Sequence, residues 1–401
     1  MDNLSHSVVG LALGELAHHS LPVEAAPQDQ RQRRRLLLTA GWASANFPDL
    51  DLLLSGLLPS PLGYLLQHRG HTHTVLYALP QALLLVALIW LLWPGARRLL
   101  AHSATARTGL LASVTLGFLS HLAMDYLNSY GIHPFYPFEA RWYYGDLVYI
   151  LEPVFWTVCG VPLALTIASR AKRVTLLALL AGALLLCAWA GFLHWTSLLL
   201  LLALAVYVGA LQGRAPDGRR ALLAGFMLGA LFIGVQHLTS TLARQALFAQ
   251  LRAADPASRV LDIVLTAYPA NPLCWNYVSV ERDDGAGRYR LRRGALGLGG
   301  AACPARLAAK DATFDASLAG LRAQADADCW LRAWLRFARA PVLGAGSASD
   351  LRFGAPDEPN FSHLALGAAS HAACPAGVPP WTPPRADLLQ PVAVNTAAHA
   401  P

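Results

Sequence analysis

Long apolar runs separated by short basic segments fill the first 240 residues of the chain. The run at 75–93 is long enough to cross a bilayer as a helix. Pro48 interrupts another run, at 36–58, and should end its helix. Residues 4–20 have a helical period and form either a span or a half-buried helix. Further spans are predicted at 109–127, 148–168, 174–193, 195–211 and 221–240. We therefore predict a bundle of about seven or eight membrane helices over residues 1–240.

From about residue 241 the composition becomes polar and rich in arginine. Alternating apolar residues predict strands at 260–266, 275–281 and 288–292, with a turn at 283–285. A helix is predicted at 316–338 and one more short strand at 349–353. The Ala- and Pro-rich tail at 372–401 is expected to be poorly ordered. The predicted fold is mainly α: a transmembrane helix bundle followed by a small α+β domain at 241–371.

The composition supports a membrane protein and argues against a nucleic-acid partner. Only 14% of the residues are charged and the mean hydropathy is +0.39, whereas soluble domains carry about 25% charged residues. The net charge of +7 could suggest nucleic-acid binding. Before residue 241, however, all Lys and Arg except Arg69 and Arg141 lie in four short clusters between apolar runs. Such clusters are typical of cytoplasmic loops.

Placing these four clusters in the cytoplasm makes the spans alternate and puts the polar domain outside the cytoplasm. The N-terminus lacks the basic and compact apolar regions of a cleavable signal peptide, so none is expected. Thiols outside the cytoplasm are commonly oxidised, so at least one disulfide is expected in the polar domain. Its four cysteines, which allow three pairings, are Cys274, Cys303, Cys329 and Cys374.

Residues suited to metal binding gather beside three of the apolar runs. Three histidines occur within six residues, His68, His71 and His73, directly before the run at 75–93. Two aspartates follow Pro48, and a histidine and an aspartate stand four apart on one predicted helix face. These pairs are Asp49 with Asp51 and His121 with Asp125. The predicted topology places all of them at the outer face of the membrane.

This set offers oxygen and nitrogen donors and no cysteine, which favours a divalent ion: zinc first, or manganese or iron, as one or two ions. A metal with an open position would polarise an ester or phosphoryl oxygen and activate water. Arg69 could then hold a phosphate, and Asp49 or Asp146 could act as general base. Taken singly, His121 could be a helix-packing group, the two aspartates a helix cap, and Asp146 and Glu152 interface residues. His133, His194 and His237 are assigned no role.

The motifs resemble those of the YdjM-type inner-membrane metal-dependent hydrolases, a family described as LexA-binding. The matching elements are His6, Pro48-Asp49-Leu50-Asp51, His68-Arg69-Gly70-x-Thr72-His73-Thr74 and Gly117-Phe118-Leu119-Ser120-His121-Leu122-x-x-Asp125. The segment 131–138 is similar to the loop that follows this aspartate in the family. The resemblance implies a metal or catalytic set of His6, Asp49, Asp51, His68, His73, His121 and Asp125. His71 occupies a variable position of the family motif.

Together these observations indicate a multi-pass protein of the bacterial inner membrane with a metal-dependent hydrolase site at the outer face. A membrane lipid or lipid-like ester or phosphodiester is the expected substrate class. The alternative is a non-catalytic binding or assembly protein with a structural metal. A transporter is less favoured, because proton relays usually lie near mid-membrane. All versions of the metal hypothesis require His73 and His121 to point to one centre.

Overall fold

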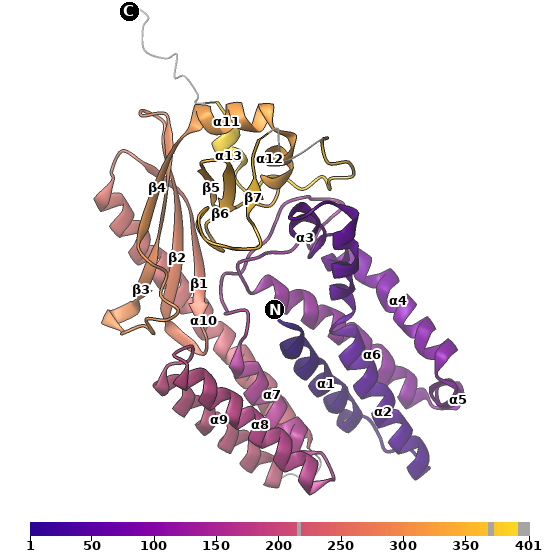
Figure 1. The fold of residues 1–401 in the computed structure, drawn as a ribbon. Helices are drawn as coiled ribbons and strands as arrows, with labels where there is room; N and C mark the ends of the chain where they lie inside the picture. The colour runs from indigo at the N-terminus through magenta and orange to yellow at the C-terminus, as the bar shows by residue number, and fades with distance from the viewer. Residues whose placement is uncertain (215–217, 368–372, 392–401) are drawn as a thin grey trace, which may run out of the picture.

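The computed structural model describes residues 1–214, 218–367 and 373–391, and shows a helix bundle joined to a domain that contains two sheets (Figure 1). The long helices of the bundle are α1 (Asn3–Ser20), α2 (Pro27–Ser44), α4 (Val75–Leu92), α6 (Ala104–Tyr126), α7 (Pro153–Leu165), α8 (Arg170–Trp189), α9 (Trp195–Arg214) and α10 (Arg219–Ala254). Shorter elements connect them: η1 (Phe47–Leu57), α3 (Leu62–Gln67), η2 (His71–His73) and α5 (Pro94–His102). The predicted fold class, a helical bundle followed by an α+β domain, is confirmed.

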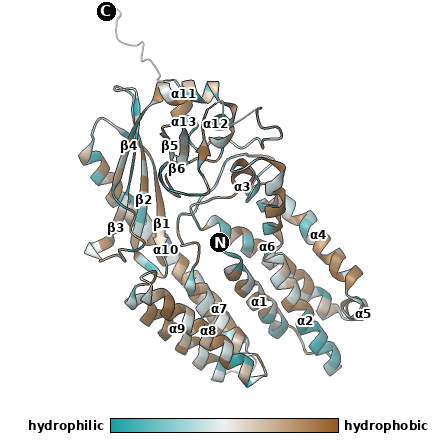
Figure 2. Cartoon of the chain, in the orientation of Figure 1, coloured by the Kyte–Doolittle hydropathy of each residue, from teal (hydrophilic) through white to brown (hydrophobic). Residues whose placement is uncertain are grey.

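Four helices of the described residues, α4, α8, α9 and α10, are long and apolar enough to cross a membrane. Helix α7 is apolar but shorter. Figure 2 shows the apolar character of α4, α8 and α9. It also shows the hydrophilic half of α2, at the end of the bundle that is farther from the sheets. Length and composition therefore identify fewer spans than the predicted seven or eight, and α1, α2, α6 and α7 complete the bundle.

Glycines allow the helices that carry the metal-binding residues to pack closely. A Cβ on Gly10 of α1 would lie 2.4 Å from the carbonyl oxygen of Gly41 on α2, which is too close for any other residue. A Cβ on Gly117 of α6 would lie 1.8 Å from Ser44 Oγ. Small residues permit such close helix crossings in membrane proteins. The contact of α6 with the end of α2 brings His121 beside the backbone of Ala45, with 2.7 Å between His121 Nδ1 and the carbonyl oxygen.

The basic segments meet at the opposite end of the bundle from the predicted metal-binding residues. Arg33 of α2 pairs with Glu24, which also accepts a hydrogen bond from Ser103 before α6. Arg34 donates to Thr166, the residue that caps the C-terminal end of α7. These basic segments therefore lie at one end of the bundle, as the charge pattern predicted.

The domain beyond helix α10, named the outer domain for its place at the end of the bundle, contains two antiparallel sheets in the described part of residues 255–391. The first has the order β1-β2-β3-β4 and the second β5-β6-β7. Their strands are β1 (Arg259–Tyr268), β2 (Asn271–Asp283), β3 (Arg288–Gly297), β4 (Ala312–Ser317), β5 (Pro341–Gly344), β6 (Ser347–Asp350) and β7 (Leu364–Ala365). The three strands predicted at 260–292 are present, and the turn between β2 and β3 contains residues 284–287.

Two predictions for this domain are wrong in detail. The helix predicted at 316–338 is two helices, α11 (Leu318–Ala327) and α12 (Cys329–Trp334), and its first residues belong to β4. Asp328 separates them, because its side chain caps α12 by accepting hydrogen bonds from the N–H groups of Trp330 and Leu331. The strand predicted at 349–353 ends instead at Asp350, whose carboxylate binds Arg352 and turns the chain.

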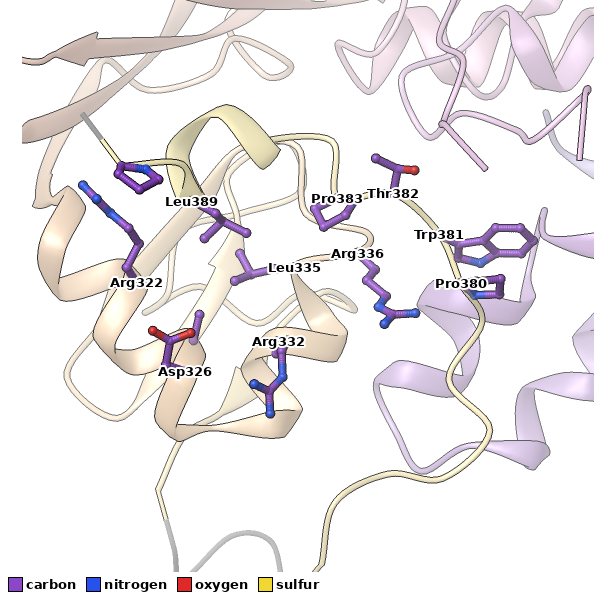
Figure 3. Close-up of a pocket in the computed structure, with 12 residues that line it drawn as sticks. Arg322, Asp326, Arg332, Leu335, Arg336, Pro380, Trp381, Thr382, Pro383 and Leu389 are labelled. Atoms are coloured by element: carbon purple, nitrogen blue, oxygen red, sulfur yellow. The ribbon is translucent and has the colours of Figure 1, made fainter. Parts of the chain in front are cut away.

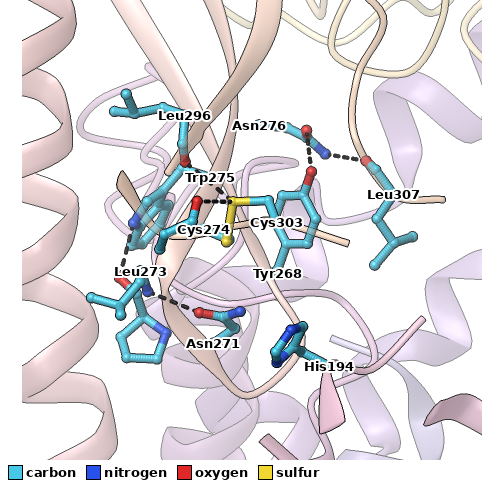
Figure 4. The surroundings of a disulfide bond; sticks show 12 residues. His194, Tyr268, Asn271, Leu273, Cys274, Trp275, Asn276, Leu296, Cys303 and Leu307 are labelled. Carbon is cyan, nitrogen blue, oxygen red and sulfur yellow. Dashed lines mark hydrogen bonds between the residues drawn. A yellow bond between two sulfur atoms is a disulfide. The ribbon is translucent and has the colours of Figure 1, made fainter. Parts of the chain in front are cut away.

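All four cysteines of the outer domain form disulfides, Cys274–Cys303 and Cys329–Cys374. Figure 4 shows the first, which ties β2 to the segment after β3 near Trp275. The second disulfide joins the start of α12 to the beginning of the tail. The expected oxidation of these thiols is therefore confirmed, and one of the three pairings is selected.

Part of the tail is ordered, contrary to the prediction. Trp381 is 1% exposed, and the short helix α13 (Ala386–Leu389) buries Leu388. The tail is held here because the indole N–H of Trp381 donates to the carbonyl oxygen of Leu66 in helix α3, at 2.8 Å. Residues 392–401 of the predicted tail lie outside the described residues.

Candidate metal centre

Three chain segments converge at the outer-domain end of the bundle. Helix α2 ends at Ser44, and the 3₁₀ helix η1 then turns Asp49 and Asp51 inward. The short helix η2 presents His73. The last turns of α6 supply His121 and Asp125. Each of these five side chains is buried, so the segments enclose a polar centre within an otherwise apolar bundle.

Four of these residues place one ligand atom each around a common point. The ligand atoms of Asp49, His73, His121 and Asp125 all lie within 4.8 Å of one another. The Nε2 atoms of His73 and His121 are 2.9 Å apart. Asp125 Oδ2 lies 3.0 Å from His73 Nε2, and Asp49 Oδ1 lies 3.5 Å from it. The required convergence of His73 and His121 is thus met.

The two imidazoles are oriented through their other ring nitrogens. His121 Nδ1 lies 2.7 Å from the carbonyl oxygen of Ala45, which can only accept, so this nitrogen carries the proton. His73 Nδ1 lies 3.0 Å from Thr72 Oγ1, which itself donates to Asp51, and 3.2 Å from Asp51 Oδ2, so this nitrogen also carries the proton. Both Nε2 atoms are left with lone pairs directed at the centre. A histidine that donates its second N–H to a carbonyl or carboxylate is the usual form of a metal ligand.

Asp51 acts mainly as the organiser of the histidine segment. Its carboxylate accepts hydrogen bonds from the backbone N–H of Arg69 at 2.8 Å and from Thr72 Oγ1 at 2.7 Å. It also lies 2.9 Å from His68 Nδ1. Asp49, Asp51 and His68 form a second group of convergent ligand atoms, with Asp49 common to both groups. Because Asp51 already accepts several hydrogen bonds, the first group is the stronger site for one ion.

His6 and Arg69 contact Asp125, a member of the four-residue group, but do not themselves belong to that group. His6 Nε2 lies 3.1 Å from Asp125 Oδ1, and its ring stacks on His121 at 4.1 Å. Arg69 Nη2 lies 3.1 Å from the same oxygen, and the α-amino group of Met1 also contacts it. Arg69 donates further to Asn128 Oδ1 at 2.9 Å. The Arg69 guanidinium is therefore committed to Asp125 and its surroundings, which argues against the predicted role in phosphate binding.

The electrostatics favour a cation at the centre. Burial raises the pKa of the Asp49 carboxyl, but the adjacent imidazoles of His73 and His121 lower it more, so the pKa lies below its usual range. The same balance, with His68 and His73 as partners, lowers the pKa of Asp51. Asp125 Oδ2 is buried and accepts no hydrogen bond in the described part of the chain. An ion would neutralise these charges and satisfy that oxygen.

Asp146, predicted as a general base, lies elsewhere. Both of its oxygens accept hydrogen bonds from Arg339, each at 2.9 Å, and Arg244 binds Oδ2 at 2.7 Å. Because these arginines occupy the carboxylate, Asp146 joins the bundle to the outer domain instead of serving the centre. Glu152 has a similar position: it is buried and accepts from the N–H of Ala270 in the outer domain. Burial raises the pKa of Glu152 to about 8.

His71 points away from the centre into a cluster of aromatic rings. It is 4.9 Å from Trp381 and 5.1 Å from Tyr136, measured between ring centroids. Trp381 also stacks on His133 at 3.8 Å. The sequence did not reveal that the tail reaches this segment, since no local pattern near Trp381 indicates its distant partner. The variable position of the motif is thus the one that faces the outer domain.

Comparison with known proteins finds a family match for the part of the chain that contains this centre. Residues 1–195 match the model of the YdjM inner membrane protein family. The match covers slightly less than half of the chain. The YdjM region contains every residue of the centre, whereas the outer domain lies outside the match.

A curated relative, the uncharacterized protein YfhP of Bacillus subtilis (strain 168), is 27% identical over 179 residues. The alignment covers 45% of this chain and 50% of that protein, so the chain spans about half the length of the relative. No solved structure matches. The YdjM match supports an inner-membrane protein, and the geometry of the centre supports a site that could hold a metal ion.

Proposed function

We propose that this protein is a metal-dependent hydrolase of the bacterial inner membrane that acts on a lipid-like ester or phosphodiester. The observation that carries the proposal is the buried group of two imidazole and two carboxylate ligands in the YdjM region. Zinc is the first choice of ion for this donor set, with manganese or iron as alternatives. Held there, a divalent ion would polarise the scissile group and lower the pKa of a water molecule.

Asp49 is the residue best placed to handle a proton. Its side chain is 5% exposed, whereas those of His73, His121 and Asp125 are fully buried. Substrate and water would therefore approach the centre from the side of Asp49. A carboxylate with a low pKa is ionised at neutral pH and can accept a proton from water. His121 and His73 are held by Ala45 and Asp51 and would keep the site in one geometry.

The surface beside Asp49 supports a lipid substrate. In η1 the residues Pro48, Asp49 and Asp51 point inward and are buried. The leucines between and after them point outward: Leu50, Leu52, Leu53, Leu54 and Leu57, of which Leu53 is 80% exposed. An exposed apolar surface of this kind marks a membrane or ligand contact. Because η1 lies at the end of the bundle, these leucines would enter the headgroup region and bring lipid to the carboxylates.

Hydrolysis can be tested with the full chain in nanodiscs loaded with zinc or manganese. Release of fatty acid or of phosphorylated headgroup from phosphatidylglycerol and phosphatidylethanolamine would be measured by mass spectrometry. We expect turnover by the native protein and a loss of at least about a hundredfold in Asp49→Asn, since general-base catalysis contributes that much. Asp357→Asn makes the same chemical change at an exposed aspartate of the outer domain and is the matched control, which should retain turnover. A metal-loaded protein without turnover on any ester would favour the non-catalytic alternative, a binding or assembly protein with a structural metal.

We also infer that the outer domain is extracytoplasmic. The basic segments gather at the far end of the bundle, and cationic loops face the cytoplasm. The two disulfides fit an oxidising compartment. Alkaline phosphatase and green fluorescent protein fused at Gly218 and at Asp284 should report opposite compartments, with phosphatase activity only at Asp284. Cytoplasmic signals at both positions would refute this orientation and the outer-face site with it.

A further inference from the structure

A pocket of about 660 Å³ in the outer domain is bordered by three arginines. Arg322 lies on α11, Arg332 on α12, and Arg336 directly after α12. The other side of the pocket is formed by the segment 380–391. Figure 3 shows the three arginine side chains around the pocket, with Asp326 as the acidic residue beside them.

The lack of partners sets these arginines apart from others in the same domain. Paired arginines of the domain include Arg282, Arg288, Arg290, Arg292, Arg293, Arg339, Arg352 and Arg385. Among the described residues, Arg322, Arg332 and Arg336 form no ion pair with a carboxylate. Three guanidinium groups and one carboxylate, that of Asp326, line the cavity, so the potential there is positive.

Two of these side chains are fixed at one edge only. Arg322 Nε donates to the carbonyl oxygen of Leu318 at 2.9 Å. Arg336 Nη1 donates to the carbonyl oxygen of Pro379. Within the described chain, their remaining N–H groups and those of Arg332 have no protein acceptor. The pocket thus offers several donors in planar forks, the arrangement that suits phosphate oxygens.

Apart from Asp326 and Thr382, the rest of the lining is apolar. Leu335, Leu389 and Trp381 contribute to it. Since the cavity is far larger than one phosphate group, it has room for an organic group against these side chains. We propose that this pocket binds a phosphate ester, with the phosphate on the arginines and its organic group on the apolar wall. Trp381 belongs to both this wall and the aromatic cluster of His71, so bound ligand would contact the segment that joins the two parts of the protein.

The test uses the full chain in phosphatidylcholine nanodiscs and glycerol 3-phosphate as probe, with calorimetric titration. Arg322→Gln and Arg332→Gln should each weaken binding roughly tenfold, because a hydrogen bond to a charged group is worth that much or more. Arg252→Gln removes an exposed arginine of α10 outside the pocket and should leave the affinity unchanged. His73→Ala should also leave it unchanged, which separates this site from the metal centre.

A second arm identifies the source of the phosphate. Nanodiscs that contain phosphatidylglycerol should compete with glycerol 3-phosphate if the natural ligand is a lipid headgroup, and should not compete if it is soluble. Both results support a phosphate site. Absence of binding to the native protein, or equal affinity in Arg332→Gln and Arg252→Gln, would overturn the proposal.

Discussion

A His73→Ala variant should lose nearly all of its bound metal. The imidazole supplies a ligand atom 2.9 Å from His121 Nε2 and 3.0 Å from Asp125 Oδ2, so its removal opens one side of the four-residue group. The substitution also frees Asp51, to which His73 Nδ1 is bound. Loss of one ligand together with its orienting contact should lower the metal affinity by more than the roughly 10- to 100-fold expected for an orienting residue alone. Elemental analysis of purified protein measures the metal content directly.

His71→Ala provides the matched control for this prediction. The two histidines are two residues apart in η2, but His71 faces Trp381 and Tyr136 instead of the centre. Its loss should leave the metal content unchanged. Equal metal content in all three proteins, or equal losses in both variants, would show that the centre does not hold the ion. Asp125→Ala should behave as His73→Ala does, because Asp125 Oδ2 has no hydrogen-bond partner in the described chain that could explain its burial.

The residues of the centre could be predicted from the sequence, but the separate role of each residue could not. Ionisable side chains beside membrane helices are costly, so their number alone indicated a site. Which of them bind metal depends on the second contacts of each group. Asp51 was predicted as a ligand and belongs to the second group of convergent ligand atoms, and the packing of Arg69 and Thr72 around it adds an orienting role. Arg69 was predicted to hold phosphate, yet it is buried against Asp125. Such contacts depend on three-dimensional packing that no spacing specifies.

The fold was predictable where local pattern decides and not where distant segments meet. The apolar runs predicted the bundle helices, and the alternation of apolar and polar residues at 260–292 predicted β1, β2 and β3. The short strands β5 and β7 carry too few residues to show a period. The tail was expected to be poorly ordered on composition alone. Its order comes from Trp381, which stacks on His133 and donates to the carbonyl oxygen of Leu66 in helix α3. Leu66 lies more than 300 residues earlier in the chain.

The junction of the two parts depends on one arginine with two acidic partners. Arg339 is buried and donates to two carboxylates. One belongs to Asp146, in the segment between α6 and α7. The other belongs to Asp262 on β1, whose Oδ2 lies 2.7 Å from Arg339 Nε. Its guanidinium also lies over the ring of Tyr144, 4.1 Å from the centroid. Burial raises the pKa of Asp262, but Arg339 lowers it more, to about 2. The Asp262 carboxylate is therefore ionised at neutral pH and depends on this cation.

Arg339→Ala should accordingly destabilise the protein by about 3–5 kcal/mol, since it leaves buried carboxylates without their main counter-charge. Thermal unfolding of detergent-purified protein would show the effect as a lowered midpoint. Arg293→Ala breaks a pair with the more exposed Glu358 and should cost less than about 1 kcal/mol. Asp146→Asn should also lower the midpoint while it retains the metal, because Asp146 contacts Arg339 and Arg244 and no residue of the centre. If Asp146→Asn instead lost activity with its metal content and midpoint unchanged, the predicted role of Asp146 as a general base would be restored and its assignment to the junction would be wrong.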